Sequence, residues 1–177
     1  MDQNSPCSAL DLVFKRRSCR VFTDTPVTPE ELDSILRAGC CAPTSKALYP
    51  CHFLVVDSRS KMQKICEYHN MSKALVTAPL CVITCADTAR SWASWRDDAA
   101  AATMNMSLCA EALGLNSCWL GVYPRVERVN RMKEQFSLPD PIIPYSILAL
   151  GHADSPKPPL GRFDPSCVHY NRWQRNS

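Results

Sequence analysis

The sequence predicts an α+β fold in which helices wrap a mixed central sheet, followed by an extended C-terminal arm. Helical and strand-like hydrophobic patterns alternate along the chain, but without the short, regular connections of a doubly wound parallel sheet. The segment 97–113 is apolar around most of a helical circumference, so it should be buried on several sides. Residues 151–177 hold four prolines, which exclude a continuous helix or a central strand there.

Five helices are expected, and the clearest begins at Thr28. Thr28 as N-cap, Pro29 as the first helical residue and Glu31 as the third form a capping box. Asp97–Asp98 suit the positive end of the dipole of the long helix, and Gly114 should end it. The expected helical ranges are 9–17, 28–40, 58–68, 97–113 and 126–136.

Strands are expected where short apolar runs are rich in β-branched and aromatic residues. No internal repeat divides the chain, and a length of 177 residues favours a single domain covering 1–177. Within the arm, 151–177, the side chains of Tyr170 and Trp173 need cover, so the arm should lie on a protein surface. The expected strands are 52–57, 80–86, 117–123 and 145–151.

The composition argues against several classes of function. With 20 basic and 17 acidic residues the formal net charge is +3, which is too even for nucleic acid or an anionic membrane to be the main partner. The most apolar stretch, 99–115, is interrupted by polar residues such as Asn105 and Glu111, so no membrane span is expected. The first residues lack the features of a secretory signal, and a cytoplasmic location is expected.

Eleven cysteines need an explanation. Their odd number and the size of the chain argue against a disulfide framework, and no Cys-x-x-Cys motif occurs. Cys81 and Cys85 lie in one expected strand, roughly 13 Å apart, which is too far to share a metal ion. Cys66 and His69 have helical spacing, but two ligands do not make a site. We therefore expect reduced cysteines packed as small apolar side chains, and no metal site.

Three segments contain groups that suit ligand binding rather than packing in a hydrophobic core. Arg16–Arg20 places three guanidiniums and one hydroxyl within five residues, and the planar arginine fork matches phosphate oxygens. The polar loop Ala42–Ser45 comes before a strand and can offer backbone groups to the edge of a heteroaromatic ring. Gly114–Gly121 combines small residues with Trp119, so its backbone could approach a flat ligand closely.

Five elements occur in one order along nearly the whole chain. They are RRSCRVF near the start, APTS before a Pro-x-His-Phe strand, an Asp-rich entry into an alanine-rich helix, GLNSCWLG, and LGHADSPKPPLGRFDP. In this order the sequence resembles the small nitroreductase family of FMN enzymes. The resemblance implies an NAD(P)H-dependent oxidoreductase with tight, non-covalent FMN at a homodimer interface. Electrons would pass from NAD(P)H through the flavin to a small oxidant such as a nitroaromatic or a quinone.

The resemblance also implies roles for single residues. No side chain is assigned as a catalytic acid or base, because the flavin carries the chemistry. His52 fits a structural role in its strand, and the adjacent Asp97 and Asp98 do not face each other as a catalytic carboxylate pair would. The positions that match are Arg16, Arg17 and Ser18 for the ribityl phosphate, Arg20 for the pyrimidine side of the ring, Pro43, Thr44 and Ser45 for the loop beside the ring, Leu120 and Gly121 for the strand end over the flavin, and Arg162 for a late return to the phosphate.

Two positions depart from the family pattern. Ala47 stands where the family often has an asparagine that donates to the flavin edge, and Tyr49-Pro50-Cys51 stands where it often has Gln-Pro-Trp. These departures leave open a non-catalytic flavin-binding carrier or sensor on the same fold. The cysteine content leaves open, with less support, a cysteine-based metal or redox protein.

Overall fold

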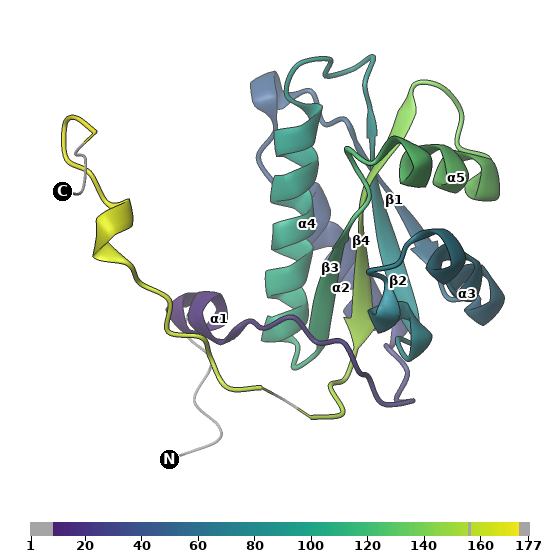
Figure 1. Ribbon diagram of the computed structural model, residues 1–177, viewed down its shortest axis with the longest axis horizontal. Helices are drawn as coiled ribbons and strands as arrows, with labels where there is room; N and C mark the ends of the chain where they lie inside the picture. Colours follow the sequence, from purple (N-terminus) through teal and green to yellow (C-terminus); the bar gives the residue numbers. More distant parts are fainter. Residues whose placement is uncertain (1–8, 156, 174–177) are drawn as a thin grey trace.

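The computed structural model describes residues 9–155 and 157–173. The ends of the expected 1–177 domain and of its arm, together with Pro156, lie outside the described residues, and the single domain stays a prediction. At the centre of the molecule is a four-stranded sheet in the order β1–β2–β4–β3 (Figure 1). The strands are β1 (Cys51–Val56), β2 (Leu80–Asp87), β3 (Asn116–Gly121) and β4 (Ile142–Gly151).

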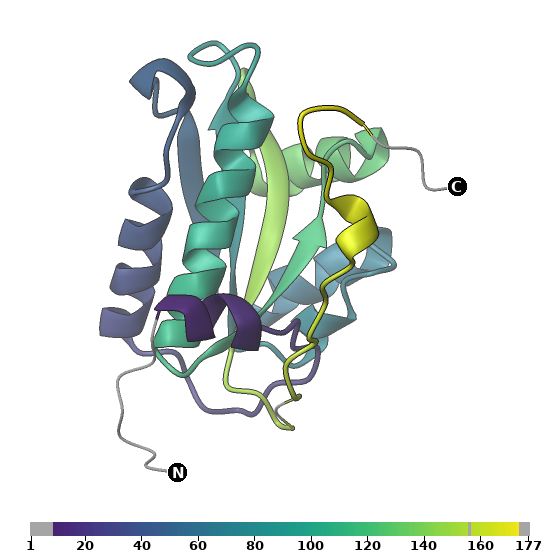
Figure 2. The ribbon, with the colours of Figure 1, turned by 90° about the vertical axis from the view of Figure 1, so that its left-hand side faces the viewer.

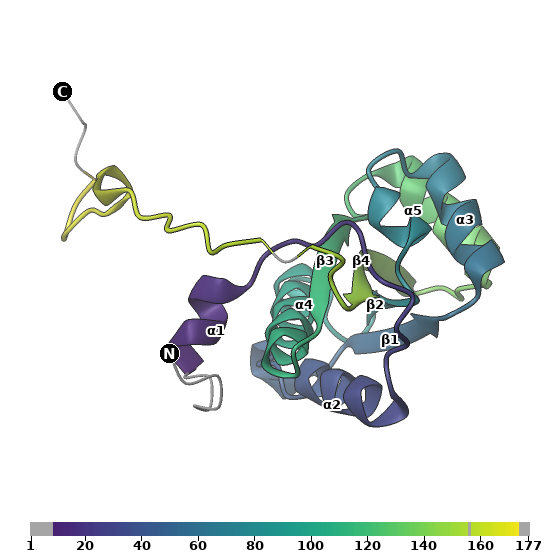
Figure 3. The ribbon, with the colours of Figure 1, turned by 90° about the horizontal axis from the view of Figure 1, so that it is seen from below.

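The described α-helices are α1 (Ala9–Lys15), α2 (Pro29–Cys40), α3 (Arg59–Tyr68), α4 (Trp95–Ala112) and α5 (Val126–Phe136). Helices α2 and α4 cover one face of the sheet, and α3 and α5 cover the other, as Figure 3 shows. Helix α1 lies outside α4. No described helix combines the length and the apolar composition that crossing a membrane requires. Three short 3-10 turns are η1 (Ser45–Ala47), η2 (Lys73–Val76) and η3 (Pro165–Cys167).

The expected α+β fold is confirmed, with a difference in the direction of the strands. All neighbouring strands of the four-stranded sheet are antiparallel. Within the described residues, parallel pairing is limited to an isolated bridge between Ser18 and Ser117. Alternating helices and strands suggested a mixed sheet, but a helix between two strands does not fix their direction. After β1 the chain passes through both α3 and η2, and it then runs back antiparallel beside β1.

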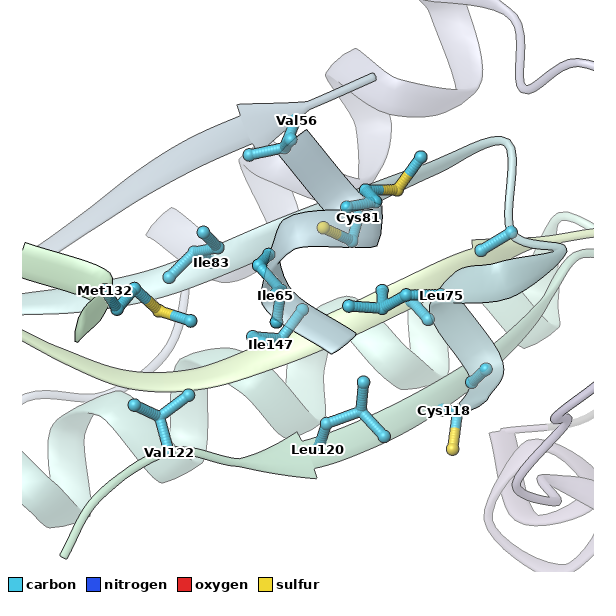
Figure 4. Close-up of a cluster of buried hydrophobic side chains, with 14 of the residues drawn as sticks. Val56, Ile65, Leu75, Cys81, Ile83, Cys118, Leu120, Val122, Met132 and Ile147 are labelled. Carbon is cyan, nitrogen blue, oxygen red and sulfur yellow. The ribbon is translucent and has the colours of Figure 1, made fainter. Parts of the chain in front are cut away.

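Side-chain alternation on the two central strands divides the core into two layers. Cys81 and Ile83 of β2 pack with α3 and α5, whereas Val82 packs with α2 and α4. Ile147 and Leu148 of β4 are divided between the layers in the same way. Figure 4 shows the first of these layers, in which β-strand and helical side chains meet. Because both faces are covered, β2 is buried along nearly its whole length, which explains why its sequence is apolar apart from Thr84 and the terminal Asp87.

Two of the expected helix signals are present in the structure. Thr28 N donates to Glu31 Oε2 at 2.7 Å, and Glu31 N donates to Thr28 Oγ1 at 3.2 Å, which completes the capping box. Gly114 follows α4 with a φ of 77°. A Cβ built at Gly114 would meet nothing within 4 Å, so glycine is needed there for its backbone conformation rather than for space.

After β4 the chain leaves the rest of the molecule as an extended arm (Figures 1 and 2). The base of the arm is fixed, because Thr23 N donates to His152 O at 2.9 Å. Further along, Phe163, Tyr170 and Trp173 are 79%, 75% and 80% exposed. These aromatic side chains are uncovered in the single chain, and the expectation that the arm packs on a partner surface stays a prediction.

Candidate functional site

A cationic cavity of about 200 Å³ lies where the segment after α1 meets the start of β3 and the base of the arm. Ser18 is one of its lining residues. Four cationic side chains face two carboxylates on its walls, so the net charge favours an anion. The cations are Lys15, Arg17, Arg20 and Lys157, and the carboxylates are Glu111 and Asp154.

Hydrogen bonds fix the wall of the cationic cavity to the sheet, to α4 and to the arm. Cys19 N donates to Ser117 O at 2.9 Å across the outer edge of β3. The hydroxyl of Ser117 shares a 2.8 Å hydrogen bond with that of Ser107 on α4, and both side chains are buried. On the arm side, the Arg17 guanidinium donates to the Pro158 carbonyl. The segment that carries the guanidiniums is therefore held from three directions.

Two of the arginines assigned to the phosphate do not line the cationic cavity. Arg16 lies close to Glu111 instead. Burial raises the pKa of Glu111, and the nearby charges of Arg16 and Lys15 lower it in part. Arg16 therefore offsets the negative charge of Glu111 and does not contribute to the wall of the cationic cavity. Arg162 lies in the exposed part of the arm, beyond the contact of Arg17 with Pro158.

The outer edge of β3 presents backbone groups beside the cationic cavity. The Ser117 carbonyl points to this edge, because it accepts from Cys19. Since alternate residues of an antiparallel strand direct N–H and C=O to the same edge, Trp119 and Gly121 also direct theirs outward. Leu120 pairs inward with β4, and its side chain lies in the core (Figure 4). Of the two residues assigned to the flavin on β3, Gly121 is the one whose backbone faces outward.

The Gly121 carbonyl is held by two donors. His69 Nε2 lies 2.9 Å from the oxygen, and Arg128 Nη1 lies 3.0 Å from it. Arg128 Nη2 also donates to Asn70 Oδ1 at 2.9 Å. Because a carbonyl only accepts, the His69 proton is on Nε2; His69 Nδ1 is buried and has no hydrogen-bond partner among the described residues. These contacts fix the end of the β3 edge.

His69 should make the stability of the protein depend on pH. Burial, and then the nearby charge of Arg128, lower the pKa of His69 below its ordinary value of 6.5. Folding therefore favours the neutral ring. The contribution of the neutral ring to the stability of the protein is complete above pH 6.5, and it is lost as the pH falls toward the pKa of His69 in the folded state. His69→Gln keeps a donor for Gly121 but does not titrate. Denaturant unfolding at about pH 7.5 and about pH 5.5 should show a larger acid loss for the wild type than for His69→Gln. Equal losses would contradict this role.

The loop Pro43–Tyr49 (the η1 loop) contains Pro43, Thr44 and Ser45, the residues assigned to the ring side, and it has a strained backbone. Lys46, Ala47 and Tyr49 have φ of 52°, 54° and 46°, and they are three of the five described non-glycine residues with positive φ. Each such residue costs roughly 1–2 kcal/mol, and strain of this kind often marks functional loops. At Ala47 this conformation suits the asparagine that the family often has, but alanine offers no side-chain donor.

The η1 loop is attached to α4 through a buried carboxylate. Ser45 N donates to Asp98 Oδ1 at 2.8 Å, and Ser91 Oγ donates to Asp98 Oδ2 at 3.2 Å. Asp98 is 4% exposed, and it is the only acidic side chain in the buried set of the described residues. The sequence predicted a position at the start of the long helix for Asp98, but not this contact with the loop.

The segment after α1, which lines the cationic cavity, and the η1 loop lie at opposite ends of α4 (Figures 1 and 2). Glu111, near the C-terminal end of the helix, faces the cavity, and Asp98, near its N-terminal end, holds the loop. At 1.5 Å per residue these two positions are about 20 Å apart along the helix. A single chain therefore carries two separate parts of the expected site.

The cysteines of the described residues are free thiols. Burial raises the pKa of Cys81 and of Cys85 to about 12. Cys66 and His69 have different partners, because Cys66 Sγ donates to the Ser72 carbonyl at 3.7 Å. Across 9–155 and 157–173, no group of three or more His, Cys, Asp or Glu is arranged to hold a metal ion.

Comparison with known proteins assigns the chain to a family. The model of the nitroreductase family matches residues 13–80 and 73–152. An Archaeoglobus fulgidus protein, provisionally named NADH dehydrogenase/NAD(P)H nitroreductase, is 35% identical over 170 residues and covers 93% of this chain and 98% of its own. This chain belongs to the nitroreductase family.

Solved structures agree with the assignment. A Bacteroides thetaiotaomicron protein, also provisionally named NADH dehydrogenase/NAD(P)H nitroreductase, superposes with a TM-score of 0.91 at 34% identity, over 93% of this chain and 98% of the other. A Clostridium difficile protein named FMN-dependent nitroreductase gives a TM-score of 0.87 at 31% identity, over 92% and 99%. These two structures share their fold with more than nine tenths of the present chain.

Proposed function

We propose that this chain binds FMN and uses NAD(P)H to reduce a small oxidant such as a nitroaromatic or a quinone. The observation that carries the proposal is the cationic cavity beside the outward-facing backbone edge of β3, in a chain of the nitroreductase family. An NAD(P)H-dependent flavin oxidoreductase agrees with the names of the relatives. The proposal includes the cytoplasmic location expected from the sequence.

The residues present fit both ends of FMN, the phosphate and the ring. Arg17, Ser18 and Lys157 would bind the phosphate, because guanidinium, hydroxyl and ammonium groups are its usual ligands. The outward N–H of Gly121 would face the heteroaromatic edge of the ring. Arg20 would place a positive charge near the ring and stabilise negative charge there. Bound FMN supplies the hydride and electron transfer, so the chain needs to orient its ligands rather than to provide an acid or a base.

We also propose that a second copy of the chain completes the site. The cavity of about 200 Å³ is smaller than the usual range for a cofactor of this size, roughly 300–1,000 Å³. The η1 loop of the same chain is about 20 Å away along α4. Val13 and Phe14 of α1 are 58% and 68% exposed, as the arm aromatics are, so α1 and the arm offer a dimer surface. In a homodimer, the η1 loop of one protomer would lie beside the cavity of its partner, and Arg162 would reach a phosphate only after assembly.

The proposal is tested by the absorption spectrum of the purified protein and by anaerobic titration. The protein should carry the visible bands of FMN, and NADH or NADPH should bleach them at about one equivalent per flavin. Protein that remains colourless after incubation with FMN, with no change in flavin fluorescence, would contradict the proposal.

A flavin-binding carrier or sensor is the second candidate, favoured by Ala47 and Cys51 at the ring side. It would also bind FMN, but it would turn over slowly. Steady-state oxidation of NADH and of NADPH, with a quinone and with a nitroarene as acceptors, separates the two functions. Sustained turnover supports the enzyme, whereas flavin binding without turnover supports the carrier.

A further inference from the structure

We propose that Asp98 is a positioning residue that holds the η1 loop in the conformation facing the flavin ring. The role of the loop in this statement rests on the proposed function, whereas the contact itself is a property of the chain. Both carboxylate oxygens are engaged, one by the Ser45 amide and the other by the Ser91 hydroxyl. At 4% exposure the group is almost fully withdrawn from water. A buried carboxylate in this position needs these donors, and the loop needs its acceptor.

The η1 loop requires such an anchor because its backbone is strained. Ser45 directly precedes Lys46 and Ala47, both of which have positive φ. Strained residues persist only where the surroundings fix them from several sides. Tyr49 N donates to Thr44 Oγ1 at 3.2 Å, which closes the loop on itself. The bond from Ser45 to Asp98 joins this closed loop to the buried start of α4, and on the exposed side Arg90 Nη1 also donates to the Tyr49 carbonyl, at 3.4 Å.

The position of Asp98 on α4 makes the anchor strong. The carboxylate lies in the first turn of an 18-residue helix, where the dipole favours a negative charge. Hydrogen bonds to an ionised acceptor are roughly twice as strong as neutral ones. The next turn of α4 is fixed in the core, since Ala99, Ala102 and Thr103 are at most 1% exposed. The Asp98 contact thus fixes the position of the η1 loop relative to α4, the most buried of the described helices.

Asp98→Ala is the test, with Asp97→Ala as the matched control. Asp97 is the neighbouring acid of the same helical turn, but it is exposed, whereas Asp98 is buried and accepts from Ser45 N of the η1 loop. In flavin-free protein, amide hydrogen exchange at Ser45 should accelerate at least about tenfold in Asp98→Ala and change little in Asp97→Ala. Unchanged exchange at Ser45 in Asp98→Ala would overturn the proposal, whatever the protein binds.

Flavin binding provides the second arm of the experiment. Loosening the η1 loop should weaken the binding of FMN and of riboflavin by the same factor, about tenfold, because the loop is assigned to the ring and not to the phosphate. The redox potential of bound flavin should shift in Asp98→Ala and not in Asp97→Ala. Faster exchange at Ser45 with unaltered flavin affinity and potential would show a purely structural anchor and overturn the positioning role. If the wild type binds no flavin, the proposed function fails, and the exchange result still stands on its own.

A second variant covers the case in which Asp98→Ala does not fold. Ser45→Pro removes the amide donor and leaves Asp98 in place. Proline is tolerated at the first position of a helical turn, and Thr44 already has the extended backbone that a following proline requires, with φ −129° and ψ 147°. Ser45→Pro should weaken the binding of both flavins equally, as Asp98→Ala should. Normal affinity and potential in this variant would overturn the proposal.

Discussion

Arg17→Ala should weaken FMN binding about ten- to a hundredfold and leave riboflavin binding almost unchanged. Arg17 lines the cationic cavity, and FMN differs from riboflavin only in the phosphate that this cavity would hold. Loss of one charge-assisted hydrogen bond costs about 1.5–3 kcal/mol, which gives this range of affinities. Flavin fluorescence titration of the wild type and the variant with both ligands measures the difference.

Arg37→Ala is the control for Arg17→Ala. Arg37 is an exposed arginine of α2 that pairs with Asp33 at 2.6 Å, so its removal changes the net charge equally without touching the cavity. FMN binding should be nearly normal in this variant. An equal loss of FMN and riboflavin in Arg17→Ala would mean that Arg17 supports the fold or the ring, and the phosphate assignment would then fail.

Truncation of the chain after Gly151 should weaken the proposed dimer at least about a hundredfold and release FMN. The truncated chain loses Phe163, Tyr170 and Trp173, which are exposed aromatic side chains of the arm. Burying side chains of this kind contributes about 1.5–3 kcal/mol each, so the loss at the interface should be large. Sedimentation over a range of protein concentrations gives the dimer affinity, and flavin fluorescence gives the occupancy.

The double variant Lys157→Ala/Arg162→Ala separates the two tasks of the arm. It removes two of the cations of the arm, Lys157 and Arg162, but keeps the aromatic side chains. The full-length double variant should therefore remain a dimer and bind FMN weakly, whereas the truncated chain should lose both properties. A truncated chain that sediments like the wild type would remove the arm from the interface.

Local signals in the sequence predicted the secondary structure well. The capping box of Thr28 and Glu31 involves neighbours in the chain, so its chemistry is visible without a fold. The α5 range was predicted to the residue, because its apolar residues recur with helical spacing and no competing signal lies nearby. At α4 the helix begins earlier than predicted, at Trp95. The carbonyl of Ser94 already accepts from the N–H of Asp97 and Asp98, whereas the side chain of Ser94 makes no capping hydrogen bond there.

Contacts between distant parts of the chain were not predictable in the same way. The three arginines of 16–20 look alike in the sequence, but Arg16 lies beside Glu111, which is 95 residues further along. Lys157 was missed because its place in the cavity depends on the path of the arm, although a lysine within the proline run was a signal. The bond between Ser45 and Asp98 spans 53 residues, and the acid looked like an ordinary helix-start residue.

The separation of the cavity and the η1 loop along α4 has a consequence for how the cofactor is acquired. If no single protomer holds a complete site, loading with FMN is second order in chain concentration, and dilution should release the cofactor together with the partner. The reverse also follows from mass action: FMN at a hundredfold excess over its Kd would stabilise the assembled state by about 2.7 kcal/mol per site. Cofactor supply would then regulate how much of the protein is assembled, without any separate effector.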